Sequence, residues 1–186
     1  MIDGELELVA PDVTLVDEVL AAAHHSLTVR DAPADASVTR ERLQEFCRVA
    51  PGGRQRADVS KGWVPAYHFW MRLNSSAAEV MMAGGIGVRI GATKEIELYS
   101  GNIGYHVYPP ARGHHYAERA VRLVLPLFAR HGLSHIWITT NPDNAASRRT
   151  CERLGAELIE TVAIPKGHPF RSRGETAKCR YLLRIL

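Results

Sequence analysis

One stretch of the chain, Gly101 to His131, constrains the fold more than any other. It begins with strand-forming residues at 102–108, passes two prolines and continues as an amphipathic helix from about His114 to His131. The residues between these two elements, Arg112 to Ala117, form a turn at the start of the helix. Backbone N–H groups at a helix start lack partners within the helix, and the helix dipole is positive there. The stretch therefore predicts an anion site, typically one for a phosphate.

The spacing of apolar residues predicts the other helices and strands. We expect helices at 12–27, 37–50, 114–131 and 144–154, and strands at 5–10, 64–73, 79–90, 95–99, 102–108, 135–140, 156–164 and 178–185. Ser37 or Thr39 should cap the second helix, and the strands at 95–99 and 102–108 should form one long strand bent at Ser100-Gly101. The order of these elements predicts a mixed α/β sheet with helices on both faces.

The composition limits the class of protein. At 186 residues, with 46% hydrophobic and 23% charged residues, the chain is expected to form a single soluble domain over 1–186. Three separated cysteines, an acidic N-terminus without a secretion signal and the lack of a long apolar stretch predict a cytoplasmic protein that does not bind a membrane. The net charge of +3 fits an anionic ligand and is too small to indicate nucleic acid. Basic residues near the end of the chain are expected on a solvated face: Lys166, Arg171, Arg173, Lys178, Arg180 and Arg184.

Two further motifs complete a known pattern. Asn144-Ala145-Ala146-Ser147-Arg148-Arg149 opens the last predicted helix, and Glu152-Arg153-Leu154-Gly155 ends it. Together with the turn at Arg112 to Ala117, they resemble the GNAT superfamily of acyl-CoA-dependent N-acyltransferases, and most of all a bacterial branch of acetyltransferases. The resemblance implies a GNAT-type mixed, mostly antiparallel sheet of about seven strands with helices on both faces. It also implies acetyl-CoA as co-substrate, an amine of a small molecule or peptide as acceptor, and direct attack in a ternary complex.

The predicted turn suits coenzyme A, which carries a pyrophosphate and a peptide-like arm. The turn residues expected to contact it are Arg112, Gly113, His114, His115, Tyr116 and Ala117. The strand edge formed by Tyr105, His106 and Val107 could pair with the amides of the arm as an added strand would. The resemblance places Asn144 and Ser147 on the other side of that arm.

The turn departs from the family pattern at His115, where glycine is usual. A bulky residue is tolerable there if its side chain points away and φ is negative. His114 and His115 either donate to phosphate oxygens or face solvent at the helix start.

Acyl transfer to an amine needs a base near the acyl group. Glu97 is the first choice and Glu95 the second, because the period of a strand places both on one face; each could equally be a surface carboxylate. The Val107 N–H is the expected oxyanion donor. Cys151 occupies the position where the resemblance implies a tyrosine general acid, and it is either that acid or an ordinary buried residue. Tyr105 is another candidate acid, and a thiolate leaving group could also make an acid dispensable.

Other readings stay open or fail. The histidines and cysteines show no zinc spacing, so no metal is expected. A binding module that holds CoA without turnover, and acyl transfer to a hydroxyl, remain alternatives, as does a homodimer. The acceptor would be framed by the helices near 27–50 and by glycine- and proline-containing loops at 51–62 and 165–176, the second of them expected to be mobile. Trp63, Tyr67 and Trp70 line that side or belong to the core.

Overall fold

The computed structural model describes residues 1–25, 38–58, 60 and 62–185. They form two compact units. Unit 1 comprises Met1–Val88 and Tyr105–Leu123, and unit 2 comprises Arg89–Gly104 and Val124–Leu186. The cap expected at Ser37 lies outside the described residues, as does the end of the first predicted helix at Leu27. That the two units together make one domain stays a prediction.

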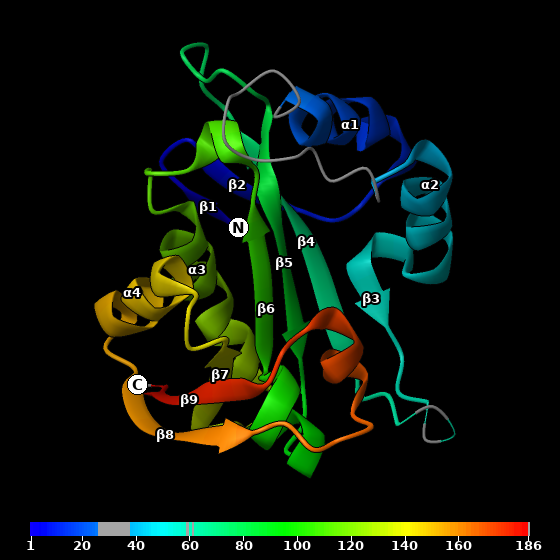
Figure 1. The fold of residues 1–186 in the computed structure, drawn as a ribbon. Helices are drawn as coiled ribbons and strands as arrows, with labels where there is room; N and C mark the ends of the chain where they lie inside the picture. The colour runs from blue at the N-terminus through cyan, green and yellow to red at the C-terminus, as the bar shows by residue number, and fades with distance from the viewer. Residues whose placement is uncertain (26–37, 59, 61, 186) are drawn as a thin grey trace. The chain divides into compact units, whose positions relative to one another are not determined.

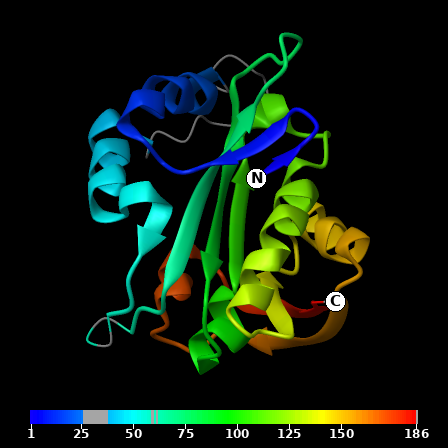
Figure 2. The same ribbon diagram turned by 180° about the vertical axis from the view of Figure 1, so that it is seen from behind.

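Unit 1 is built on a sheet with the strand order β1-β2-β4-β5-β6, to which β3 adds by pairing with β4 (Figure 1). The strands are β1 (Ile2–Asp3), β2 (Leu6–Val9), β3 (Arg54–Gln55), β4 (Ala66–Leu73), β5 (Met82–Arg89) and β6 (Ile103–Val107). Figure 2 shows the same sheet from behind, with the N-terminal strands in blue. β2 pairs antiparallel with β4, and its alternate residues Leu6 and Leu8 are buried. This period of two places one face of the sheet in the core, as the sequence predicts.

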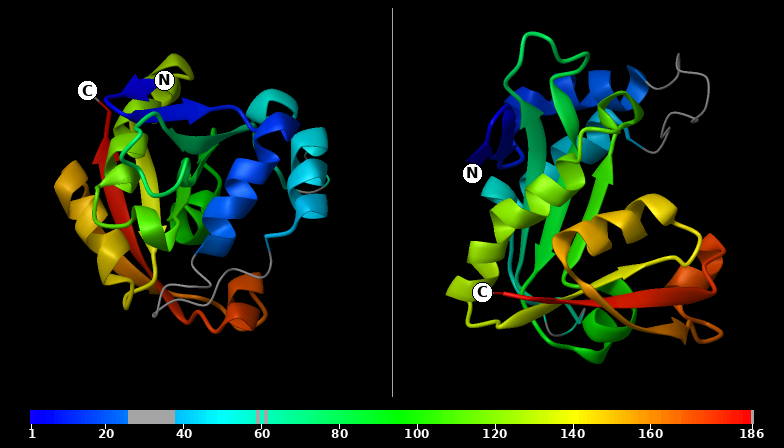
Figure 3. Two further views of the ribbon diagram at one scale, coloured as in Figure 1. Left: turned by 90° about the horizontal axis from the view of Figure 1, so that it is seen from above. Right: turned by 90° about the vertical axis from the view of Figure 1, so that its left-hand side faces the viewer.

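Helices lie on both faces of this sheet, and this confirms the predicted α/β architecture. Figures 1 and 3 show α1 (Val16–His25) and α2 (Arg40–Val49) on one side and the first half of α3 (Tyr116–Arg130) on the other. Thr39 caps α2 by accepting a hydrogen bond from the Arg42 N–H, which confirms one of the two expected caps.

Unit 2 contains a second sheet with the order β7-β9-β8, whose strands are yellow, red and orange in Figure 3. Its elements are β7 (His135–Thr140), β8 (Glu157–Ala163), β9 (Ala177–Arg184) and α4 (Ala145–Leu154). Both pairings are antiparallel. One face is apolar, because Ile138 lies opposite Tyr181 and both side chains are buried. The described residues thus contain nine strands in two sheets, where about seven were expected.

The prediction of a strand at 95–99 is wrong. These residues belong to a helical segment that ends in a π-helical turn, η4 (Ile96–Ser100), which we call the Glu97 turn. The Gly101 N–H closes the turn by donating to the Ile96 carbonyl over 2.8 Å, and Gly101 has a φ of +67°. A Cβ atom there would lie 3.1 Å from the main chain of Trp137, so glycine fits both the torsion angle and the close approach.

The two later helices end where the sequence predicts. Gly132 and Gly155 follow α3 and α4 with φ values of +77° and +80°. α3 continues through Pro126 to Arg130. The segment at 165–176, expected to be a loop, contains one short helical turn, η6 (Pro169–Arg173). None of the helices described is long and apolar enough to cross a membrane.

Candidate active site

The β6–α3 connection in unit 1 forms the predicted turn. A short helical turn, η5 (Pro109–Ala111), leads into four exposed residues, 112–115, and α3 begins at Tyr116. The His115 carbonyl accepts the first helical hydrogen bond, from the Arg119 N–H at 3.0 Å. The N–H groups of the next residues along, at the start of α3, therefore precede the helical hydrogen-bond ladder and are oriented to bind an anion.

His115 has a φ of +59° and is the one residue other than glycine with positive φ in the described part of the chain. The condition of a negative φ, under which a bulky residue is tolerable here, is therefore not met. In the left-handed region a side chain costs about 1 kcal/mol or more relative to glycine, although histidine is among the residues found there most often. The geometry explains why the family pattern has glycine at this position.

The side chains of the turn add charge and planar surface. The Arg112 Nε donates to the Val107 carbonyl over 3.2 Å, so its guanidinium folds back over the end of β6. The His114 and Tyr116 rings stack with centroids 5.5 Å apart. The His115 Nδ1 lies 3.9 Å from a carboxylate oxygen of Glu118. The turn thus presents exposed imidazole and guanidinium groups around the N–H donors.

Strand β6 is the last strand in the path of the unit 1 sheet among the described residues. That its outer edge pairs with the amides of the arm stays a prediction. The side chains of Tyr105 and Val107 are partly buried, and His106 is exposed. A Cβ atom at Gly84 would lie only 2.0 Å from the His106 carbonyl oxygen. The glycine in β5 therefore lets β6 approach closely.

The candidate carboxylates lie in unit 2. Glu97 is partly exposed on the Glu97 turn, whereas Glu95 precedes it and accepts a hydrogen bond from the His168 Nε2 at 3.0 Å. The prediction that both share one face is wrong, because residues two apart lie on roughly opposite sides of a helical turn. The His168 Nδ1 accepts from the Phe170 N–H at 3.2 Å, so the proton on Nε2 is directed at Glu95. Glu95 thus anchors η6 through His168.

Side chains from three strands bind the carbonyl groups of the Glu97 turn, and one of them, Arg180, is buried. The Arg180 Nε donates to the Glu97 carbonyl at 2.6 Å, and the Thr139 Oγ1 to the Tyr99 carbonyl at 2.7 Å. The Arg89 guanidinium donates to the carbonyls of Ser100 and Gly101 at 3.2 and 3.1 Å. Burial lowers the pKa of Arg89, and the nearby charge of Glu95 opposes this.

None of the side chains that bind the Glu97 turn was among the predicted site residues. Arg180 and Lys178 are buried, so the expectation of a solvated basic face is wrong for both. Lys178 and Arg180 are two residues apart in β9, so both side chains lie on the same face of the sheet. This spacing was the one signal in the sequence that could have indicated a shared role. Asn102, which is also buried and joins the main chains of Arg89 and Trp137, gave no signal at all.

The helix α4 carries the remaining predicted residues. The Asn144 Oδ1 accepts from the Ser147 N–H at 3.0 Å and so caps the helix. The Cys151 side chain has no exposed surface, and burial, with a contribution from Glu152, raises its pKa to about 12. This burial favours a packing role for Cys151 over proton donation.

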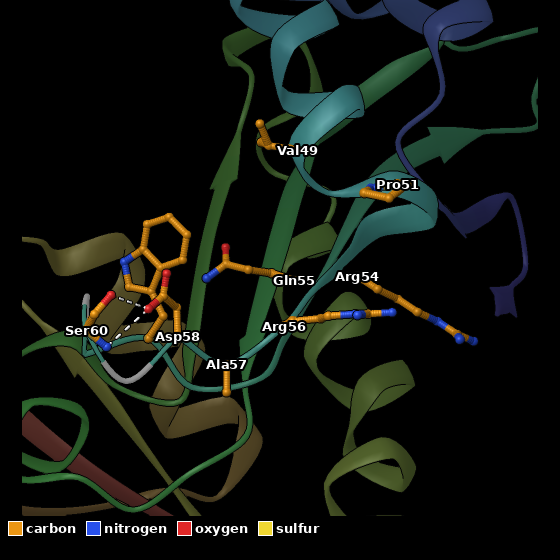
Figure 4. A pocket seen from close by; sticks show the side chains of 9 residues that line it. Val49, Pro51, Arg54, Gln55, Arg56, Ala57, Asp58 and Ser60 are labelled. Atoms are coloured by element: carbon orange, nitrogen blue, oxygen red, sulfur yellow. Dashed lines mark hydrogen bonds between the residues drawn. The ribbon is translucent and has the colours of Figure 1, made fainter.

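Unit 1 also has an open hollow of about 770 Å³ on the segment after α2 (Figure 4). Its lining combines polar and apolar residues: Val49, Pro51, Arg54, Gln55, Arg56, Ala57, Asp58, Ser60 and Trp63. Figure 4 shows Gln55 extending toward the side of Asp58 and Ser60, and Arg54 and Arg56 extending away from it. Trp70 is buried, which supports the core alternative for that residue, whereas Trp63 is 47% exposed.

Comparison with known proteins agrees with this architecture. The family model of the acetyltransferase (GNAT) domain matches residues 6–157. No protein with a curated function matches the chain in sequence.

Solved structures have the same fold. MccE, the microcin C7 self-immunity acetyltransferase solved with acetyl-CoA and AMP, is 15% identical, with a TM-score of 0.66 over 98% of this chain and 94% of that one. RimL, a ribosomal L7/L12 alpha-N-protein acetyltransferase solved with coenzyme A, is 17% identical, with a TM-score of 0.64 over 100% and 97%. An acetyltransferase from Salmonella typhimurium, which modifies the N-terminal serine of L7/L12, is 17% identical, with a TM-score of 0.61 over 99% and 96%. At these identities the likeness shows the fold, and the family match goes further: this chain belongs to the GNAT acetyltransferase family.

Proposed function

We propose that this protein transfers the acetyl group of acetyl-CoA to an amine of a small molecule or peptide by direct attack in a ternary complex. The observation that carries the proposal is the β6–α3 turn. It combines the N–H groups at the start of α3 with the exposed side chains of Arg112, His114 and His115. Such a donor set fits a pyrophosphate. Structural neighbours solved with acetyl-CoA or coenzyme A support the choice of ligand.

Each part of coenzyme A has residues that suit it. The residues proposed for the pyrophosphate are Arg112, Gly113, His114, His115, Tyr116 and Ala117. The edge of β6 at Tyr105, His106 and Val107 is proposed to pair with the amides of the arm. Asn144 and Ser147 are proposed as further contacts. Because the Asn144 oxygen caps α4, its amide N–H groups are the atoms proposed to donate to the ligand.

Glu97 is proposed as the base. Its carboxylate would take a proton from the acceptor ammonium, directly or through water. The neutral amine nitrogen then bonds to the thioester carbonyl carbon and the C–S bond breaks. The nitrogen loses a second proton to give the amide, and coenzyme A, leaving as a thiolate, takes up one proton to become the free thiol. The Val107 N–H is proposed to stabilise the oxyanion. Tyr105 is the better candidate than Cys151 for the acid, since Cys151 is fully buried.

The release of free thiol from acetyl-CoA tests the reaction. A panel of amines, with peptide α-amines first, should support release, since two structural neighbours are named for the α-amine or N-terminal serine of L7/L12. Release with hydroxyl acceptors alone would favour O-acetylation. Tight binding of acetyl-CoA without release under any condition would favour the binding module. Glu97→Gln should lower turnover at pH 7 by at least about tenfold if Glu97 is the base.

Calorimetric titration with acetyl-CoA tests the turn. Gly113→Glu places a carboxylate among the N–H donors and should weaken binding by at least tenfold. Gly132→Glu is the matched control. Both glycines have positive φ, with open space around the position of a Cβ atom, and Gly132 follows the opposite end of α3. Equal affinities of the two variants would show that the phosphate assignment is wrong.

A further inference from the structure

The Glu97 turn is too short to be stable on its own. It has five residues, and the first turn of a helix fixes many torsion angles for few hydrogen bonds. Single π-helical turns are rare and occur often at functional sites. The position of Glu97 must therefore depend on the groups that bind the turn from outside.

Arg180 binds the carbonyl group of Glu97 from another strand. Its Nε donates to the Glu97 carbonyl at 2.6 Å, and its Nη1 forms an ion pair with Glu160. Its guanidinium carbon lies 4.1 Å from the centroid of the Trp137 ring. Only 7% of Arg180 is exposed. The Glu97 carbonyl, the Glu160 carboxylate and the Trp137 ring together hold the guanidinium in one orientation. The single ammonium group of a lysine could not make all three contacts.

A second buried cation on the same strand, Lys178, binds residues outside the Glu97 turn. Lys178 donates to Asn141 at 2.8 Å, pairs with Glu175 and lies 4.7 Å from the Phe170 ring centroid. It resembles Arg180 in burial, charge and aromatic neighbour. The two residues therefore separate the effect of losing a buried cation from the effect of losing the contact with Glu97.

We propose that Arg180 is a positioning residue for the transfer reaction: it fixes the backbone of Glu97 so that the carboxylate is held at the acceptor amine. The inference rests on the proposed function, in which Glu97 is the base. Arg180 acts through the main chain, and its charge is balanced by Glu160. A displacement of about 1 Å in a reacting group can cost on the order of a hundredfold in rate.

The kinetic test compares Arg180→Gln, Arg180→Lys and Lys178→Gln in the full chain. Arg180→Gln should lower kcat about 10- to 100-fold with KM for acetyl-CoA unchanged, and Arg180→Lys should restore only part of the rate. Lys178→Gln should leave kcat within about twofold of the wild-type value, even if it lowers the melting temperature as much as Arg180→Gln does. In a Glu97→Gln background, Arg180→Gln should have no further effect on the rate, because the two residues then act as one unit. Equal loss of kcat in Arg180→Gln and Lys178→Gln, or additive loss in the double variant, overturns the proposal.

A measurement that needs no turnover separates this inference from the proposed function. The Gly101 N–H, which closes the turn, should exchange with deuterium faster in Arg180→Gln than in the wild type or Lys178→Gln. Unchanged exchange shows that Arg180 does not fix the turn and overturns the inference. A wild type that releases no thiol with any acceptor contradicts the proposed function, whereas faster exchange would still establish the contact between Arg180 and the turn.

Discussion

Asn102 and Trp137 exchange two hydrogen bonds, one through the main chain and one through a side chain. The Asn102 N–H donates to the Trp137 carbonyl at 2.7 Å, and the Trp137 N–H donates to the Asn102 Oδ1 at 2.8 Å. The Asn102 amide nitrogen donates in turn to the carbonyls of Arg89 and Gly91. One buried side chain thus satisfies main-chain groups on two segments at once.

Asn102→Asp should destabilise the protein by about 3 kcal/mol. The carboxylate cannot donate to the carbonyls of Arg89 and Gly91, and its negative charge would be buried against these two carbonyl oxygens. Urea denaturation at pH 7 measures the free energy of unfolding. Asn74→Asp is the control, since Asn74 donates to Glu7 on the exposed surface. A loss below about 0.5 kcal/mol at Asn102 would contradict the role described.

His115→Gly should stabilise the protein by about 0.5–1 kcal/mol, since the left-handed torsion angle of His115 suits glycine. His114→Gly should destabilise it, because His114 is not in that region and glycine adds freedom to the unfolded chain. Urea denaturation of both variants gives the two signs. The affinity for acetyl-CoA then decides between the two roles of His115. A fall of at least fivefold in His115→Gly indicates that the imidazole donates to a phosphate. An unchanged affinity indicates that only the backbone at this position contacts the ligand.

The bond from Arg119 lowers the pKa of Glu5 to about 2, from an ordinary value of 4.5. A carboxyl with a lowered folded-state pKa contributes stability above pH 4.5 and loses it as the pH falls toward 2. Arg119→Gln should therefore flatten the dependence of the urea midpoint on pH between 4.5 and 2. Arg122→Gln, which removes the pairing with Glu118 within the same helix, should keep the slope of the wild type. Parallel slopes in all three proteins would mean that Arg119 does not set the Glu5 pKa.

The three cysteines are buried, and Cys151, with a pKa near 12, should be the least reactive. At pH 8 only a minute fraction of its thiol is ionised, so labelling by iodoacetamide in the native protein should be far slower than in urea. Because its folded-state pKa lies above the ordinary value of 9, its contribution to stability is complete below pH 9 and declines as the pH rises toward 12. Peptide mapping after labelling identifies the residue. Rapid native labelling of Cys151 would restore it as a candidate acid.

Local signals in the sequence were sufficient for most elements. The apolar period predicted β4, β7 and α4, and the glycines after α3 and α4 marked their ends. The Glu97 turn was missed because Glu95 to Tyr99 alternates like a strand. What decides its conformation is the set of carbonyl contacts from Arg89, Thr139 and Arg180, and Arg180 lies 83 residues away in the chain.

In the candidate site, too, features set by the local sequence were predictable and features set by distant contacts were not. The turn at Arg112 to Ala117 was predictable, since a helix start has free N–H groups whatever the tertiary structure. The φ of His115 was not predictable, because it depends on how the chain enters α3. The burial of Arg180 was not predictable either, because its aromatic and acidic neighbours, Trp137 and Glu160, come from other strands.

The long reach of the Arg180 contact has a consequence for synthesis and folding. Arg180 is in the last strand, so a growing chain that has already made β6 and α3 still lacks the group that binds Glu97. The Glu97 turn would be fixed only when β9 pairs with β7 and β8. A chain truncated before β9 should then form the β6–α3 turn while the Glu97 turn lacks its contact with Arg180.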